Sequence, residues 1–397
     1  MLYRKSRRLM VGVLAMLMVV GMVLPAMGQD VAVKIDGNSI NLSSAPVIKD
    51  GVTLVPVRGI VEALGGEVSY DAASKTVKIK TTDRTISFPV GAREAKNNNM
   101  TEAMEAPAQI VNGSIMVPVK FLAEAVGAKL DYNEVGKIIN IAYFSNLKGT
   151  LKIGGSTTIQ PLSQLAADTL MKMNPDLSIT IAGGGSGEGI KGAYSGTFNI
   201  GSVSRDLEEK DKKSYPGLTS YRIGTDGIVV IVNPKNMVGE LTQQQVFDIF
   251  TGQVRNWKQV GGKDAAIFLQ TRETGSGTLT AFEELALQKI DKKAKVAKTA
   301  TPSTSNGLIK EAIAQNANAV GFLSMGYVDS SVKAVKVDGV SPLKSKALSR
   351  EWPYVRTLNV VTKGQATGLT AKFIDYLLSP EGQSIVSQDY LPLKAVD

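Results

Sequence analysis

The sequence predicts an α/β protein preceded by a small α+β domain that is built from two repeats. From residue 151 onward, strand patterns alternate with helix patterns, which is typical of a largely parallel sheet. Between residues 30 and 145, one sequence unit occurs twice, with a spacing set by Pro56 and Pro118. We therefore expect two structural regions that differ in architecture.

The first 28 residues are predicted to be a signal peptide. Four basic residues within positions 4–8 precede an apolar run from Leu9 to Leu24, and small residues end the segment at Gly28. We expect cleavage after Gly28 and a secreted or extracytoplasmic protein. A retained membrane anchor is the alternative, and the absence of cysteine excludes a lipid anchor.

Composition narrows the function classes. The 397 residues include neither Cys nor His, which excludes a disulfide framework, a thiolate metal site and a Ser-His-Asp triad. Most hydrolase templates are thereby excluded, although composition alone leaves an enzyme possible. Because the sequence also has no cluster of metal-ligating carboxylates, we expect a binding protein rather than an enzyme, with no metal and no cofactor. The net charge of +9 loses four units with the signal segment. Such a mildly basic protein suits an anionic ligand or a cell-wall surface, and we expect no nucleic-acid partner.

The repeat domain is expected to span residues 29–146. Each unit, at 52–66 and again at 114–128, reads as a strand, a Pro-Val turn and a short helix ended by glycine. An alternating hairpin pattern follows each unit. Residues 145–150 are expected to form a short polar linker.

Three corners with hydroxyl side chains, each containing or directly following glycine, lie at strand-to-helix junctions of the second region. They are at residues 156–158, 185–187 and 276–278, and Arg272 accompanies the last. Backbone N–H groups and the positive end of the helix dipole gather at such junctions. Each corner alone is typical of an ordinary capping turn. Together they predict a site that holds a desolvated tetrahedral oxyanion. Residues 303–307 open a further helix, either as a cap or facing the same site.

Several motifs in this region resemble the phosphate-binding protein of bacterial phosphate ABC transporters, within the periplasmic binding protein type II superfamily. They are GSTTIQPL, GGGSGEGIKG, IGSVSRDL, DGIVVIVNP, RETGSGT, NAVGFLSMGYV and FIDYLLSPEGQ, in the family's order. The resemblance implies two α/β lobes that clamp phosphate across a hinge, and membrane permease subunits as partners. We expect lobe one to hold residues 150–230 and 325–397, and lobe two residues 233–322.

The repeat region resembles the copper amine oxidase N-terminal-like domain, an accessory module of secreted Gram-positive proteins. Because no His or Cys is present, the resemblance implies attachment to the cell wall or a stalk rather than copper binding.

By motif match, the resemblance implies phosphate contacts from both lobes, at Thr157, Thr158, Ser186, Arg272, Ser276, Gly277 and Thr278. Many family members carry an aspartate after the third strand, which accepts the proton of hydrogen phosphate. Ser204 and Arg205 occupy that place here and are added as candidate contacts.

A carboxylate that accepts this proton would favour phosphate over sulfate. Asp226 is our first candidate for the acceptor, with Glu188 and Asp206 as alternatives. The missing aspartate leaves open a second function, the binding of another oxyanion such as sulfate or molybdate. A surface-attached phosphate sensor is a further alternative.

Overall fold

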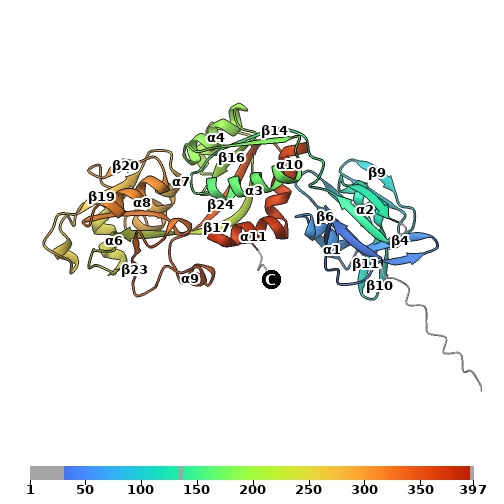
Figure 1. Ribbon diagram of the computed structural model, residues 1–397, viewed down its shortest axis with the longest axis horizontal. Coiled ribbons are helices and arrows are strands. Elements are labelled where there is room, and N and C mark those ends of the chain that lie inside the picture. Colours follow the sequence, from blue (N-terminus) through green and yellow to red (C-terminus); the bar gives the residue numbers. More distant parts are fainter. Residues whose placement is uncertain (1–30, 134–136, 394–397) are drawn as a thin grey trace, which may run out of the picture.

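The computed structural model describes residues 31–133 and 137–393, which form an N-terminal domain and a two-lobed region (Figure 1). The predicted signal segment lies outside the described residues. Within those ranges, no helix has both the length and the apolar character needed to cross a bilayer.

The N-terminal domain consists of short strands and two helices. Its elements are β1 (Ala32–Ile35), β2 (Asn38–Ser39), β3 (Val47–Lys49), β4 (Val52–Pro56), α1 (Val57–Ala63), β5 (Glu67–Asp71), β6 (Thr76–Lys80), β7 (Thr85–Pro89), β8 (Glu94–Asn97), β9 (Met100–Ala103), β10 (Gln109–Val111), β11 (Ser114–Pro118), α2 (Val119–Ala125), β12 (Lys129–Asn133) and β13 (Ile138–Ala142).

The predicted internal repeat is confirmed as two copies of one structural unit. β4 and β11 each have five residues and lead through proline into a seven-residue helix. The helices end at Gly65 and Gly127, whose φ angles of 81° and 75° suit glycine. The two strands pair antiparallel, with Val117 opposite Val55. The expected hairpins follow as β5–β6 and β12–β13.

The first lobe combines a mixed sheet with flanking helices, since β14 pairs parallel with β15 and β16 while β24 pairs antiparallel with β16 and β17. Its elements are β14 (Gly149–Gly155), α3 (Gln160–Met173), β15 (Leu177–Ala182), α4 (Gly185–Ser195), β16 (Ile200–Val203), α5 (Glu209–Ser214), the first part of β17 (Leu218–Val232), β24 (Val355–Lys363), α10 (Gly368–Leu378) and α11 (Pro380–Asp389). The sheet order is β15-β14-β16-β24-β17.

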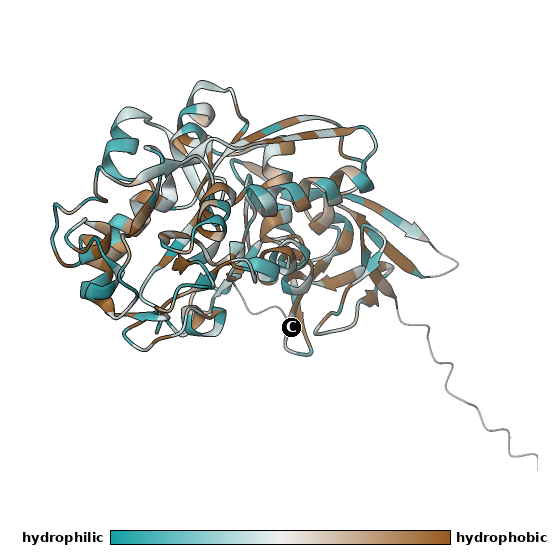
Figure 2. Ribbon diagram, turned by 60° about the vertical axis from the view of Figure 1, so that its left-hand side comes forward, coloured by the Kyte–Doolittle hydropathy of each residue, from teal (hydrophilic) through white to brown (hydrophobic). Residues whose placement is uncertain are grey.

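The second lobe extends the same strand path through β17-β21-β19-β20. Its elements are β18 (Glu240–Leu241), α6 (Gln243–Phe250), β19 (Phe268–Arg272), α7 (Gly277–Phe282), β20 (Thr301–Ser303), α8 (Asn306–Gln315), β21 (Ala319–Ser324), β22 (Lys333–Ala334), β23 (Lys336–Val337) and α9 (Lys344–Leu348). Figure 2 shows hydrophobic residues along the strands and hydrophilic residues on many outer loops.

Two strands connect the lobes. β17 is fifteen residues long and pairs antiparallel with β24, from Leu218 opposite Lys363 to Gly227 opposite Val355. Beyond that point β17 pairs with β21 and β22 of the second lobe. The expected boundary at residue 325 is therefore corrected, because residues 325–354 pack into the hydrophobic cluster of the second lobe. The chain returns to the first lobe at residue 355, where β24 begins.

The expected linker is tied to its surroundings. Asp36 accepts hydrogen bonds from the backbone N–H groups of Tyr143, Phe144 and Ser145, at 2.9, 2.8 and 2.9 Å. The Leu147 N–H donates to Asn174 Oδ1 at 2.8 Å. One hydrophobic cluster continues from the N-terminal domain into the first lobe. Backbone hydrogen bonds therefore hold the linker in place, although most of its residues are exposed.

A buried carboxylate forms hydrogen bonds between the first lobe and the N-terminal domain. Asp375 of α10 accepts from the Thr82 N–H at 3.1 Å and from the Thr82 hydroxyl, and its second oxygen accepts from the Tyr143 hydroxyl at 2.6 Å. Burial raises the pKa of Asp375, and these hydrogen bonds oppose the rise. Gly65 lies against the same turn, where a Cβ would stand 2.2 Å from the Asp375 carbonyl oxygen.

We expect Asp375→Ala to destabilise the junction by about 3 kcal/mol, because it leaves several buried donors without an acceptor. Thermal unfolding followed by calorimetry should show one transition for the N-terminal domain and first lobe of the parent, and an earlier, separate transition in the variant. Asp176→Ala removes an exposed ion pair with Lys148 and serves as the control. A variant that unfolds in one transition at the parent's temperature would contradict this prediction.

Candidate functional site

The first corner lies between β14 and α3. Thr157 and Thr158 are both buried there, and the Ser156 hydroxyl accepts from the Thr158 N–H at 3.2 Å. Two tyrosine side chains hydrogen-bond to the backbone of this loop. The Tyr327 hydroxyl donates to Thr157 O at 2.6 Å and the Tyr390 hydroxyl donates to Thr158 O at 2.5 Å. Burial raises the pKa of Tyr327 to about 12, so its hydroxyl stays a donor at neutral pH.

The second corner places Ser186 in the first turn of α4. Gly184 and Gly185 precede it with φ angles of 130° and 85°, a backbone that only glycine adopts readily. Ser186 Oγ accepts from the Ser204 N–H at 3.1 Å and lies 3.4 Å from Ser204 Oγ. The end of β16 and the start of α4 therefore present adjacent hydroxyl groups.

The third corner comes from the second lobe. Arg272, at the end of β19, donates from Nη2 to Thr157 Oγ1 at 3.2 Å, and the Thr278 and Thr158 hydroxyls lie 3.2 Å apart. A Cβ on Gly277 would stand 2.2 Å from Ser186 Oγ. The corners of the two lobes thus meet. Ser276 caps α7, because its hydroxyl accepts from the Leu279 N–H at 3.3 Å.

Arg356 of β24 lies at the centre of the site, and the sequence analysis missed it. Its Nη1 donates to Thr278 Oγ1 at 2.8 Å and to Ser204 Oγ at 3.3 Å, and its Nη2 donates to Thr158 Oγ1 at 3.0 Å. Its side chain is only 2% exposed. A lone arginine within an apolar strand pattern was the available signal, because a buried charge requires partners.

Asp226 of β17 is the ion-pair partner of Arg356. Asp226 Oδ2 accepts from Arg356 Nε at 3.0 Å and from Nη2 at 2.7 Å, while Oδ1 accepts from the Ser324 hydroxyl at 2.9 Å. Burial raises the pKa of Asp226, and the adjoining guanidinium opposes that rise. Both carboxylate oxygens are therefore engaged within the protein.

Asn306, the first residue of α8, adds an amide donor. Its Nδ2 donates to Thr158 Oγ1 at 3.0 Å and to Thr157 Oγ1 at 3.3 Å. Its Oδ1 accepts from the Ser324 N–H at 3.2 Å. Ser305 is the cap of this helix, so the segment at 303–307 both caps α8 and faces the site.

We call this group the hydroxyl cluster. It comprises Thr157, Thr158, Ser186, Ser204, Arg272, Thr278, Asn306 and Arg356. Each guanidinium has its own carboxylate, since Arg272 pairs with Glu273 at 2.9 Å and Arg356 with Asp226. The two positive charges are therefore balanced by the two carboxylates. The hydroxyl and amide groups are then the main hydrogen-bond donors for a ligand. An oxyanion in such a cluster would be held mainly by neutral hydrogen-bond donors.

The remaining predicted residues lie around the cluster rather than in it. Arg205 is buried but turned toward Asp211 and Glu208, with which it forms ion pairs. Asp206 is exposed and accepts from Thr357 and Asn359. Glu188 is exposed on α4. Of the three acceptor candidates, only Asp226 is buried beside the cluster.

Comparison with known proteins places this geometry in a family. Residues 145–381 match the PBP superfamily domain, and residues 34–141 match the copper amine oxidase N-terminal domain. The phosphate-binding protein PstS of Bacillus subtilis is 36% identical over 248 residues, which cover 62% of this chain and 81% of that protein.

Two solved structures are also similar. One, with bound phosphate, is described as a phosphate ABC transporter substrate-binding protein from Clostridium perfringens. It is 39% identical with a TM-score of 0.58, covering 62% of this chain and 100% of that one. An ABC-type phosphate transport receptor from Vibrio cholerae is 30% identical with a TM-score of 0.52, over the same shares. The chain therefore belongs to the PBP superfamily and, within it, to the family of PstS phosphate-binding proteins.

Proposed function

We propose that this protein is an extracytoplasmic receptor that captures inorganic phosphate between its lobes and delivers it to an ABC importer. The observation that carries the proposal is the hydroxyl cluster, to which both lobes contribute donors around Arg356. Its relatives named for phosphate binding share this region of the chain. We assign no catalytic step to the site.

Capture would use the hydroxyl, amide and guanidinium donors at once. A tetrahedral oxyanion offers four oxygens, and donors from opposite lobes can reach different oxygens of one ion. Because Thr278 and Arg272 belong to the second lobe, their contacts with the ligand form only when the lobes approach. Phosphate would then shift the lobes toward the closed arrangement.

The proton of hydrogen phosphate needs a hydrogen-bond acceptor, and the site has no carboxylate that is free to accept it. Asp226 is engaged by Arg356 and Ser324, so we infer that a hydroxyl oxygen of Thr158, Ser186 or Ser204 accepts it. Hydroxyl groups can donate or accept, and a site of this kind discriminates less between protonated and fully ionised oxyanions. This favours one second candidate function, the binding of sulfate or molybdate.

We place the mature protein outside the cytoplasm, associated with the surface of a Gram-positive cell. The support is the predicted signal segment and the N-terminal domain, which matches the copper amine oxidase N-terminal domain. Binding of the cell wall by that domain, and docking of the lobes on permease subunits, remain parts of the proposal. A surface-attached phosphate sensor would use the same site.

Phosphate binding is tested by calorimetry on the protein lacking residues 1–28. We expect a dissociation constant of about 1 μM or tighter for phosphate, because many charge-assisted and neutral hydrogen bonds form together. Sulfate and molybdate are titrated in competition. Absence of heat with phosphate would contradict the proposal, whereas tighter binding of sulfate or molybdate would establish the second candidate.

Gly277→Ala tests whether capture needs contact between the lobes. The added Cβ would stand 2.2 Å from Ser186 Oγ and 2.7 Å from Ser204 Oγ, both in the opposite lobe. We expect phosphate affinity to fall tenfold or more, roughly 1.4 kcal/mol, with little change in unfolding temperature. Gly307→Ala is the matched control, since it also lies in a first helical turn but its Cβ would be 3.7 Å from its nearest neighbour. Equal losses in both variants would refute a lobe-closure effect.

Arg356→Met should leave Asp226 buried and unpaired, which destabilises the protein by about 3–5 kcal/mol at pH 7. Because burial raises the pKa of Asp226, the folded variant binds a proton more readily than the unfolded chain. The stability deficit should therefore shrink as the pH falls toward about 4 and grow as the pH rises. Urea unfolding at several pH values measures this. The double variant Asp226→Asn/Arg356→Met should lose the pH dependence, and its persistence there would show that another group is responsible.

A further inference from the structure

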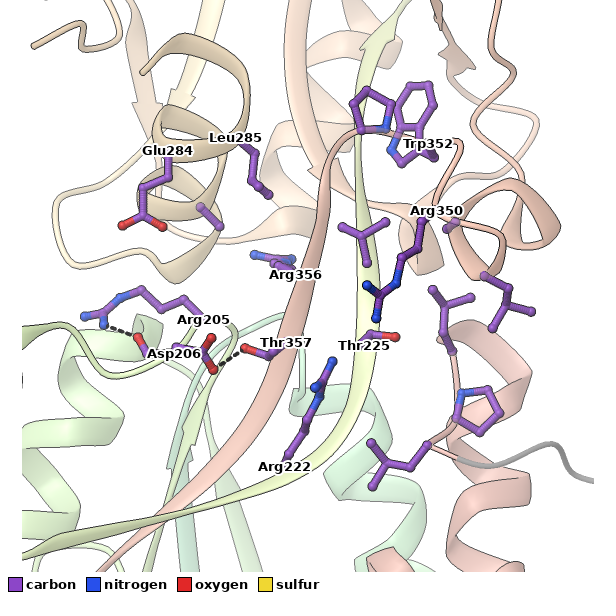
Figure 3. Close-up of a pocket in the computed structure, with 18 of the residues that line it drawn as sticks. Arg205, Asp206, Arg222, Thr225, Glu284, Leu285, Arg350, Trp352, Arg356 and Thr357 are labelled. Atoms are coloured by element: carbon purple, nitrogen blue, oxygen red, sulfur yellow. Dashed lines mark hydrogen bonds between the residues drawn. The ribbon is translucent and has the colours of Figure 1, made fainter. Parts of the chain in front are cut away.

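A second cavity lies at the hinge, separate from the hydroxyl cluster. It has a volume of about 770 Å³ and is lined from both lobes (Figure 3). The first lobe contributes Arg222 and Thr225, and the second contributes Arg350 and Trp352. Arg356 is the one cluster residue that also lines this cavity. Its guanidinium is committed to Asp226 and to the cluster hydroxyls.

Two arginines that line this cavity have side chains with no hydrogen-bond or ion-pair partner among the described residues. The described part of the chain contains nine arginines. Seven form a hydrogen bond or an ion pair, namely Arg58, Arg84, Arg93, Arg205, Arg255, Arg272 and Arg356. The side chains of Arg222 and Arg350 form neither within residues 31–133 and 137–393; both residues are exposed to solvent, and both line this cavity. Figure 3 shows the two side chains approaching Thr225 from opposite sides.

The acidic residues of the cavity do not neutralise these two charges. Asp206 accepts from Thr357 and Asn359, and Glu208 pairs with Arg205 and Lys210. Glu284 lies across the hinge strands from Arg222 and Arg350 in Figure 3. Two guanidinium groups that face one space repel each other, and an anion between them would turn that repulsion into attraction.

The backbone of Arg350 adds a second observation. Arg350 follows α9 with a φ of 61°, in the left-handed region that favours glycine after a helix. An arginine at this position costs backbone energy, and its side chain forms no hydrogen bond or ion pair within residues 31–133 and 137–393.

We propose that this cavity binds a small, multiply charged oxyanion between Arg222 and Arg350, with the Thr225 hydroxyl as an additional donor. The cavity is far larger than one phosphate ion, and two separate guanidinium groups suit a ligand with at least two anionic groups. The rim includes the exposed Leu348 and Leu393, which leaves room for an organic portion. Pyrophosphate, tripolyphosphate and citrate are suitable probes of this chemistry.

Calorimetric titration of pyrophosphate into the mature chain at low salt tests the site directly. We expect saturable binding that weakens about tenfold in Arg222→Gln and in Arg350→Gly, since each removes one charge-assisted contact. Arg350→Gly also relieves the left-handed backbone, so it should unfold at or above the parent's temperature. A loss of binding in that variant is then not a loss of folding.

Two controls locate the ligand. Arg58→Gln changes an exposed arginine of the N-terminal domain and should bind like the parent. Arg272→Met disables the hydroxyl cluster but leaves the cavity arginines in place, so it should keep saturable pyrophosphate binding, weakened no more than about threefold by the lost contact between the lobes. No binding, unchanged binding in the Arg222 and Arg350 variants, or loss of binding in Arg272→Met would each overturn the proposal. If citrate also binds, and binds more weakly in the Arg222 and Arg350 variants, the site accepts carboxylates as well. If only pyrophosphate and tripolyphosphate bind, the site is restricted to phosphates.

The bound anion should also act on the lobes. It would bridge Arg222 of the first lobe and Arg350 of a segment that packs with the second, while the two lobes are in contact. It would therefore stabilise that arrangement and raise phosphate affinity, a coupling that rests on the proposed function. We expect at least a threefold gain with saturating pyrophosphate in the parent and none in Arg222→Gln. Pyrophosphate binding without any gain would refute the coupling but not the site.

Discussion

The buried ion pair between Asp226 and Arg356 organises the binding region. Both charged side chains are buried, so each requires the other. The pair joins β17 to β24 at the point where both strands pass from one lobe to the other. With its Nε and one side of Nη2 committed to Asp226, Arg356 directs its remaining donors toward Thr158, Ser204 and Thr278. One interaction therefore links the hinge, the first lobe and the second lobe.

The charge balance of the site follows from this arrangement. Arg272 and Arg356 each have a carboxylate, so neither offers an unbalanced charge to a ligand. The neutral hydroxyl and amide groups are then the decisive donors. A site of this kind binds an oxyanion through the number and direction of hydrogen bonds, which depends on lobe contact more than on long-range attraction.

The sequence predicted the parts of the site whose signal is local. The corners at 156–158, 185–187 and 276–278 each fall within a few residues of a strand end and a helix start, and the structure brings them together. Arg356 could not be found this way, because its partner Asp226 lies 130 residues away and its neighbours read as an ordinary strand. The assignment of residues 325–354 to the first lobe failed for the same reason, since the pairing of β22 with β17 has no local signature.

The junction at Asp375 was also not predictable from local sequence, and it affects which parts of the protein can move. Residues 145–150 have the composition of a linker, yet Asp36, Asn174 and Asp375 fix the chain on both sides through contacts distant in sequence. The hydrophobic cluster is also continuous across this boundary. The N-terminal domain and the first lobe therefore form one body, and the strands of the hinge are the place where relative motion can occur. If the N-terminal domain is bound to a surface, the first lobe is held there with it. Ligand capture would then move the second lobe relative to a first lobe that stays in place.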